Sequence, residues 1–215
     1  MEAFLQALLS LDRETARRQL RLAVRGDDPT FAVESLLIPT MEQIGHLWET
    51  GAVALSQVYM SGRICEGLLD EMLPQTDDAA GGEPQTAILV FEDNHALGKR
   101  LVLSALRVAR IPVRDYGLGV TLEDLVRQVR RDRPKVLLIS VLMLRSALRL
   151  SELVRNLSAL SERPYIIVGG APFLLDRQLW RQVGADAMAA NSTEVLQLLK
   201  TLEIYPAMSE RSVAK

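Results

Sequence analysis

One histidine of this chain lies in a setting typical of a metal ligand. The pattern D-x-H-x-x-G occupies the run Asp93-Asn94-His95-Ala96-Leu97-Gly98. It directly follows an apolar run, residues 87–91, that is typical of a buried strand. Neutral imidazole binds transition metals, and an acidic partner on the other ring nitrogen fixes the tautomer and raises the basicity of the ligand. The pattern therefore indicates a metal-ligating His95 at a strand end, with Asp93 as its acidic partner.

Composition narrows the class of protein. The chain has 215 residues, of which 48% are hydrophobic and 24% are charged, so we expect one large or two small globular domains. Its net charge of −2 does not favour binding to nucleic acid. Cys65 is the only cysteine, which excludes internal disulfides and thiolate metal clusters and favours a reducing compartment. No apolar run approaches the roughly 18 residues of a membrane span, and Met1-Glu2-Ala3-Phe4 lacks a basic leader. We therefore expect a cytoplasmic protein that does not contact a membrane.

A polar stretch of small residues separates two halves with different periodicity. Residues 75–84 are rich in Asp, Ala and Gly and lack a hydrophobic pattern, as is typical of a linker. We expect a helical bundle over residues 1–74, a second domain over 85–203 and a tail over 204–215.

Helical periodicity runs through the first half. Asp12 is placed to cap a helix that ends near Gly26, and Phe31–Glu49 carries a second pattern, bent or broken before Pro39. A last helix is expected from about Leu55 to Leu73. Its predicted buried residues are Ile64, Cys65, Leu68, Leu69 and Met72. The first half is thus predicted to be an all-α bundle.

In the second half, short apolar runs alternate with amphipathic helices. The runs are Ala87–Phe91, Pro112–Tyr116, Val136–Ile139, Tyr165–Val168 and Ala185–Ala189. Asn191 and Glu194 have capping-box spacing before the final helix. This rhythm predicts an α/β flavodoxin-like domain with a five-stranded parallel sheet in the order 2-1-3-4-5.

That strand order brings three unusual features to one edge of the sheet. Strand 1 ends at the Asp93–Gly98 run, strand 3 ends at Ser140, and strand 4 ends at Gly169-Gly170. Ligands of such sheets bind beyond the carboxyl ends of the strands at the switch point. The chain lacks a G-x-G-x-x-G fingerprint and a P-loop, and Ser140 stands where a phosphoacceptor receiver has its aspartate. Other common ligands of this fold therefore fit poorly.

The ordered set of motifs resembles the cobalamin-binding module of the methionine synthase and corrinoid-protein family. The resemblance covers nearly the whole chain. It rests on D-x-H-x-x-G, Ser140-x-Leu142, Gly169-Gly170, Gly184-Ala185-Asp186-Ala187-Met188-Ala189 and, as the helical cap, residues 38–51.

The resemblance implies a base-off, His-on mode of binding. His95 would displace the nucleotide base and bind cobalt from below, Asp93 would accept the other imidazole N–H, and Ser140 would extend that relay. The nucleotide tail would lie between strands 1 and 3. The implied cofactor-binding residues are Asp93, Asn94, His95, Ala96, Leu97, Gly98, Ser140, Leu142, Gly169, Gly170, Ala189 and Ala190.

The resemblance also implies a role. A substrate-binding barrel needs about 250 residues, so a self-contained enzyme is not expected. The expected function is that of the corrinoid subunit of a methyltransferase system, holding methylcobalamin or another corrinoid. It would receive a methyl group from a donor-specific methyltransferase and deliver it to a tetrahydrofolate-type acceptor methyltransferase.

The alternative is a cobalamin-based sensor, in one form light-responsive. Cobalamin photoreceptors resemble this architecture but have Glu-His ten and eleven residues after the cap tryptophan, where this chain has Val58 and Tyr59. The chain also departs from the carrier pattern, since Leu144-Arg145 stand where many relatives have threonines.

Overall fold

A computed structural model describes residues 1–25, 29–72, 84–202 and 204–205. The chain divides into two compact units, Met1–Thr76 and Asp77–Lys215. Residues 75–83 of the expected linker and 206–215 of the expected tail lie outside the described residues.

The first unit is helical in its described residues. Its elements are α1 (Glu2–Leu9), α2 (Arg13–Ala23), α3 (Thr30–Ala32), a π-helical turn η1 (Val33–Leu37), α4 (Ile38–Glu49) and α5 (Leu55–Met72). Asp12 caps α2 as predicted, accepting from the Thr15 N–H at 3.0 Å. Of the residues predicted to be buried on α5, Met72 is only half-buried. The predicted helix ends at Gly26 and Leu73 lie outside the described residues.

Pro39 widens a helical turn instead of breaking the helix. Proline has no N–H, so the carbonyl four residues earlier loses its usual partner. The preceding turn is π-helical, and the Ile38 N–H donates to the Val33 carbonyl. Thr40 is fully buried, and its Oγ1 donates to the Leu36 carbonyl at 2.7 Å. The expected bend before Pro39 is therefore a local change of winding.

The second unit contains a parallel sheet with the predicted strand order, β2-β1-β3-β4-β5. The strands are β1 (Thr86–Val90), β2 (Val113–Asp115), β3 (Val136–Ser140), β4 (Tyr165–Gly169) and β5 (Ala187–Met188). Val90 pairs with Ser140, and Ser140 pairs with Gly169. The last residues of β1, β3 and β4 thus lie side by side. The order reverses between β1 and β3, as a doubly wound sheet requires.

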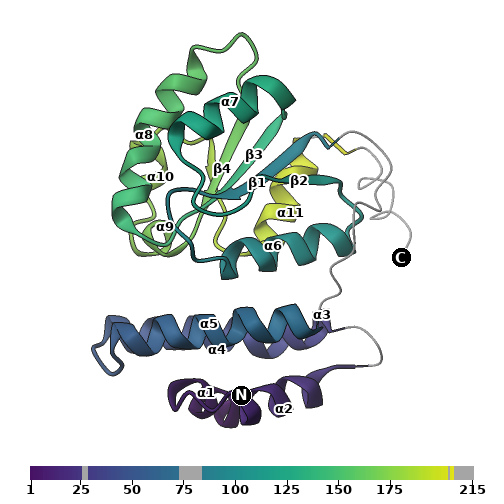
Figure 1. Ribbon diagram of the computed structural model, residues 1–215, viewed down its shortest axis with the longest axis vertical. Coiled ribbons are helices and arrows are strands. Elements are labelled where there is room, and N and C mark those ends of the chain that lie inside the picture. The colour runs from purple at the N-terminus through teal and green to yellow at the C-terminus, as the bar shows by residue number, and fades with distance from the viewer. Residues whose placement is uncertain (26–28, 73–83, 203, 206–215) are drawn as a thin grey trace. The chain divides into compact units, whose positions relative to one another are not determined.

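Helices cover both faces of this sheet (Figure 1). They are α6 (Leu97–Val108), α7 (Leu122–Asp132), α8 (Leu144–Ser158), α9 (Ala171–Leu175), α10 (Leu179–Gln182) and α11 (Ser192–Thr201). Asn191 caps α11, accepting from the Glu194 N–H at 2.9 Å. The predicted helical bundle followed by a flavodoxin-like domain is confirmed. None of the described helices combines the length and hydropathy needed to cross a bilayer.

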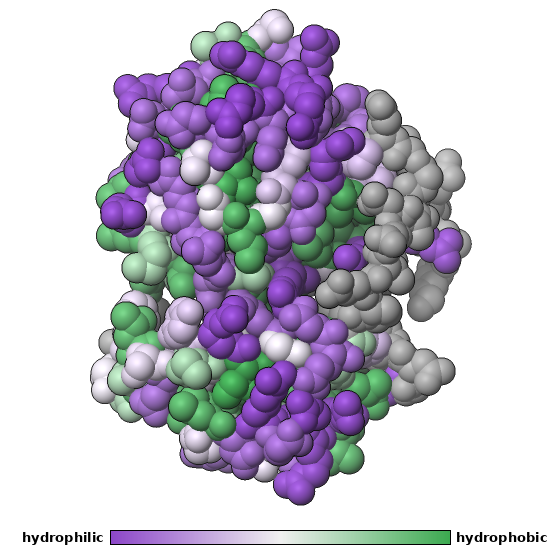
Figure 2. Space-filling model, viewed as in Figure 1, coloured by the Kyte–Doolittle hydropathy of each residue, from purple (hydrophilic) through white to green (hydrophobic). Residues whose placement is uncertain are grey.

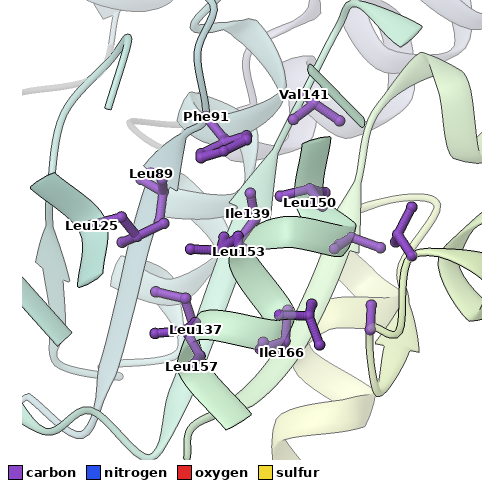
Figure 3. Close-up of a cluster of buried hydrophobic side chains, with 14 of the residues drawn as sticks. Leu89, Phe91, Leu125, Leu137, Ile139, Val141, Leu150, Leu153, Leu157 and Ile166 are labelled. Atoms are coloured by element: carbon purple, nitrogen blue, oxygen red, sulfur yellow. The ribbon is translucent and has the colours of Figure 1, made fainter. Parts of the chain in front are cut away.

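The strands alternate between two apolar cores. Leu137 and Ile139 of β3 pack with α7 and α8, as the close-up in Figure 3 shows. Their neighbours Val136 and Leu138 pack on the other face, in a cluster with residues of α6 and α11. Burial on both faces explains why β3 is a continuous apolar run. β1 is buried throughout, and the inner residues of β3 and β4 are buried too, which gives the loops at their carboxyl ends a fixed base.

The edge strands are shorter than the apolar runs suggested. β2 spans Val113–Asp115 within the predicted run 112–116, and β5 spans Ala187–Met188 within 185–189. In both cases the edge strand ends first, since β1 continues to Val90 and β4 continues to Gly169 beyond the last pair.

Candidate functional site

Asp93 links the loop after β1 to the loop after β3. Its Oδ1 accepts from the His95 N–H at 3.1 Å, and its Oδ2 accepts from the Leu142 N–H at 2.7 Å. Hydrogen bonds from neutral amides to a carboxylate are shorter and stronger than neutral pairs. The carboxylate thus holds in place two loops whose residues are 49 positions apart. The predicted bond from the His95 ring to Asp93, and its extension through Ser140, stay predictions.

His95 lies half-buried at the carboxyl edge of the sheet, just before α6. Its Nδ1 atom is shielded from solvent. Among the described residues, no cluster of three His, Cys, Asp or Glu side chains could by itself enclose a metal ion. The role of His95 as a metal ligand stays a prediction.

Gly98 and Ser140 form a close contact between α6 and the end of β3. A Cβ at Gly98 would stand 3.2 Å from Ser140 Oγ. Gly98 is exposed and Ser140 is half-buried, so solvent reaches this junction. A glycine here lets the start of α6 approach the strand closely. This is the expected route of the nucleotide tail.

Gly169 and Gly170 have a structural reason for being glycine. Gly170 has φ +116°, and a Cβ there would stand 1.9 Å from the Val141 carbonyl oxygen. A Cβ at Gly169 would stand 2.9 Å from the Ala189 carbonyl oxygen. The loops after β3, β4 and β5 therefore touch backbone to backbone at the carboxyl edge. A role for these glycines in ligand binding stays a prediction.

The remaining predicted residues surround this junction. Leu142 is half-buried, Ala96 and Leu97 are buried at the start of α6, and Asn94 is exposed. Ala189 is buried, and the half-buried Ala190 donates its N–H to Glu194 Oε2 at 2.8 Å. The structure thus places every predicted residue at the carboxyl ends of β1, β3, β4 and β5, in the loops that follow them or at the start of α6.

Sequence reasoning missed an ion pair beside the site, in which the lysine is buried and the aspartate is exposed. Lys99 is 5% exposed, and its Nζ lies 2.8 Å from Asp115 Oδ1. A lysine in the first turn of a helix is disfavoured by the helix dipole, so its presence there was a usable signal. Its partner at the end of β2 was not visible in the pattern.

A second missed feature is the strained start of the site loop. Glu92 has φ +49° and directly precedes Asp93. Its carboxylate pairs with Arg149 at 2.7 Å, and its carbonyl accepts from Ser146 Oγ at 3.3 Å. A non-glycine residue at positive φ persists where surrounding contacts hold it.

Tyr116 directly follows β2. Its pKa is raised, first because its hydroxyl is buried and second because the Asp132 carboxylate lies close, so the hydroxyl stays neutral.

Large apolar side chains are exposed in the segments that directly follow β2, β3 and β4. They are Leu118, Met143, Leu144, Leu174 and Leu175, each at least 42% exposed. On the face drawn in Figure 2, hydrophilic residues predominate and apolar residues reach the surface among them. Apolar exposure concentrated at one edge is typical of a binding surface. Together with the half-buried His95 and the solvent-exposed junction at Gly98, it fits a ligand-binding site at this edge.

Comparison with known proteins agrees with this fit. A family described as B12 binding domain matches residues 86–200, and a second family of the same description matches residues 1–72. Dimethylamine corrinoid protein 3 of Methanosarcina acetivorans is 29% identical to this chain, and the alignment covers 91% of this chain and 93% of that protein. Trimethylamine corrinoid protein 1 of Methanosarcina mazei is 24% identical, covering 90% and 92%.

Solved structures share the fold. The monomethylamine corrinoid protein of Methanosarcina barkeri superposes with a TM-score of 0.75 at 23% identity, covering 93% of this chain and 96% of that one. The methanol:cobalamin methyltransferase complex MtaBC of the same organism gives a TM-score of 0.50 at 19% identity, covering 93% and 78%. The B12-binding match spans more than half of the chain, and the predicted cobalamin cofactor is confirmed with it. The chain therefore belongs to the B12-binding domain family.

Proposed function

We propose that the second unit binds cobalamin base-off, with His95 as the lower axial ligand of cobalt. The observation that carries this proposal is the position of His95 at the switch point, in a loop held by the Asp93 carboxylate. Because Nδ1 is shielded from solvent, Nε2 is the proposed ligand atom. A metal-bound imidazole normally donates its other ring N–H to a carboxylate, carbonyl or water, and Asp93 is the proposed acceptor.

The proposed tail site lies along Gly98, Ser140 and Leu142 and continues past Gly169-Gly170 to Ala189 and Ala190. Glycine at position 98 leaves the junction with Ser140 open to solvent. The corrin would cover the exposed leucines and Met143 at the carboxyl edge. When bound, cobalamin supplies a cobalt centre that can carry a methyl group, and the chain's residues bind, orient and shield that centre.

We infer that the chain is a methyl carrier that works with methyltransferases. Relatives named as dimethylamine and trimethylamine corrinoid proteins align over about nine-tenths of both chains. A related fold occurs in a complex described as a methyltransferase. The proposed cycle uses a donor-specific methyltransferase, with methylated amines as the first donor class, and a tetrahydrofolate-type acceptor methyltransferase.

Histidine ligation is tested on cobalamin-loaded protein reduced to cobalt(II). The chain has only two histidines, so labelling histidine with nitrogen-15 reports on His46 and His95 alone. The EPR nitrogen coupling should change from the triplet of nitrogen-14 to the doublet of nitrogen-15. It should disappear in His95→Ala and persist in His46→Ala, the matched control. Coupling that instead follows a labelled dimethylbenzimidazole base contradicts the assignment.

The carrier role is tested by methyl uptake and release. Loaded protein reduced to cobalt(I) should accept a methyl group from methyl iodide, with release of iodide. In the dark, a candidate partner methyltransferase should then transfer that group to its own nucleophilic acceptor and regenerate cobalt(I). A light-responsive sensor would instead change its oligomeric state under green light. A light-driven change in light scattering, with no methyl transfer to any partner, overturns the carrier role.

A further inference from the structure

Lys99 is a buried cation close to the proposed cobalt ligand. Its Nζ donates to both carboxylate oxygens of Asp115, at 2.8 and 2.9 Å, and to the Gly117 carbonyl at 3.3 Å. Its side chain is 6% exposed, whereas that of Asp115 is 42% exposed. The pair therefore joins the first turn of α6 to the end of β2.

The ion pair continues into a segment that runs along the site loop. Asp115 Oδ1 accepts from the Gly117 N–H at 2.8 Å, and the Gly117 carbonyl accepts from the Val90 N–H at 3.0 Å. Further along, the Gly119 N–H donates to the Asp93 carbonyl at 2.8 Å. Residues 117–120, here named the strap, thus hold the backbone that leads from β1 to His95.

Two glycines allow the strap to lie this close. Gly117 has φ +94° and Gly119 has φ +63°, conformations that side chains rarely adopt. A Cβ at Gly119 would stand 3.0 Å from Asn94 Oδ1. The strap also reaches Glu92, whose N–H donates to the Val120 carbonyl at 3.2 Å. Val90, Glu92 and Asp93 thus each share a backbone hydrogen bond with the strap, and Phe91 forms a bridge with Val120 of the strap.

We propose that the Lys99–Asp115 ion pair is a positioning device that holds the strap and, through it, the loop that presents His95. Lys99 and Asp115 are positioning residues, since both act through the strap. The consequence for cobalt rests on the proposed function. The consequence for the loop does not, because it is measurable without corrinoid.

The unequal burial of the partners predicts unequal effects. Lys99→Met leaves the Asp115 carboxylate in contact with water. Asp115→Asn leaves the Lys99 ammonium buried without its charge partner, which is the more costly defect. Asp115→Asn should therefore destabilise more than Lys99→Met, and the double variant should recover part of that loss.

The opposite edge of the same sheet offers a matched control. Arg163 Nη1 lies 2.9 and 2.8 Å from the two oxygens of Asp186, and these residues precede β4 and β5. Arg163→Met likewise removes the cation from an ion pair with an aspartate, at similar distances, but at the amino edge of the sheet. It controls for general loss of stability without touching the strap.

The test reads His95 directly in corrinoid-free protein by nitrogen-15 histidine NMR. Lys99→Met should shift or broaden the His95 imidazole signals and leave His46 unchanged, while Arg163→Met should alter neither. Hydroxocobalamin affinity should fall by about 10–100-fold in Lys99→Met, the range typical of groups that support a metal ligand. If Lys99→Met does not fold, the same NMR measurement is made on the double variant Lys99→Met/Asp115→Asn, which leaves neither partner as an unpaired charge.

The outcomes separate this proposal from the proposed function. Unchanged His95 signals in folded Lys99→Met, or equal changes in Arg163→Met, overturn the positioning role. Absence of histidine coupling to cobalt in the unaltered protein instead contradicts the ligand assignment, and the NMR comparison still decides the role of the ion pair.

Discussion

Asp93→Asn separates a structural from a purely electronic role of the carboxylate. Asp93 accepts two backbone N–H groups, one through each oxygen, at 3.1 and 2.7 Å. Asparagine has one acceptor oxygen, so its amide group must face one of these donors. Hydrogen bonds to charged groups contribute about 1.5–3 kcal/mol each. We therefore expect Asp93→Asn to lower the free energy of unfolding of the second unit by about 1.5–3 kcal/mol.

The assay is urea unfolding of corrinoid-free protein, followed by far-UV circular dichroism, with cobalamin titration in parallel. Affinity should fall by about 10–100-fold as the His95 loop loosens. Asp176→Asn is the control, because Asp176 accepts from the Gln178 N–H through Oδ1 and an asparagine oxygen can keep that bond. An unfolding midpoint for Asp93→Asn equal to that of Asp176→Asn refutes the structural reasoning. A reduced cobalamin affinity with an unchanged free energy of unfolding would indicate that Asp93 acts only on the imidazole ring of His95.

Three further changes test the fold around the site. Gly170→Ala should lower the free energy of unfolding by at least about 3 kcal/mol, because φ +116° and the 1.9 Å approach to the Val141 carbonyl oxygen leave no room for a Cβ. Equal urea midpoints for Gly170→Ala and Gly98→Ala would contradict this. Gly98→Ala meets only the Ser140 hydroxyl, so it should fold normally yet weaken cobalamin binding in titration. Asn191→Ala should cost about 0.5–2 kcal/mol of unfolding free energy through the lost cap of α11, and no change in the urea midpoint would remove that cap's role. In the first unit, hydrogen bonds from Arg17 lower the pKa of Glu71 from 4.5 to about 2, so its contribution to stability is present above pH 4.5 and is lost as the pH falls towards 2. Glu71→Gln should flatten the pH dependence of helicity in that range, and an unaltered acid profile by circular dichroism would show that the pair contributes nothing.

The sequence by itself determined the kinds of element and their order. The change from helical periodicity to alternating apolar runs distinguished the helical unit from the α/β unit, because side-chain period follows backbone geometry. The parallel order then placed His95, Ser140 and Gly169 at one edge, since parallel strands end together. That inference needed only which residues follow which strand.

Only the tertiary structure decided which groups touch across that edge. Asp93 accepts from an amide 49 positions away, and Lys99 of α6 pairs with a carboxylate 16 positions away at the end of β2. Such pairs depend on register and on how far each loop rises above the sheet, which no local pattern encodes. For the same reason the sequence indicated Gly170 only as a residue of the cofactor site, while in the fold the neighbouring Val141 carbonyl requires it to be glycine. Local sequence sets backbone preference, and long-range packing decides which polar atoms lie within bonding distance.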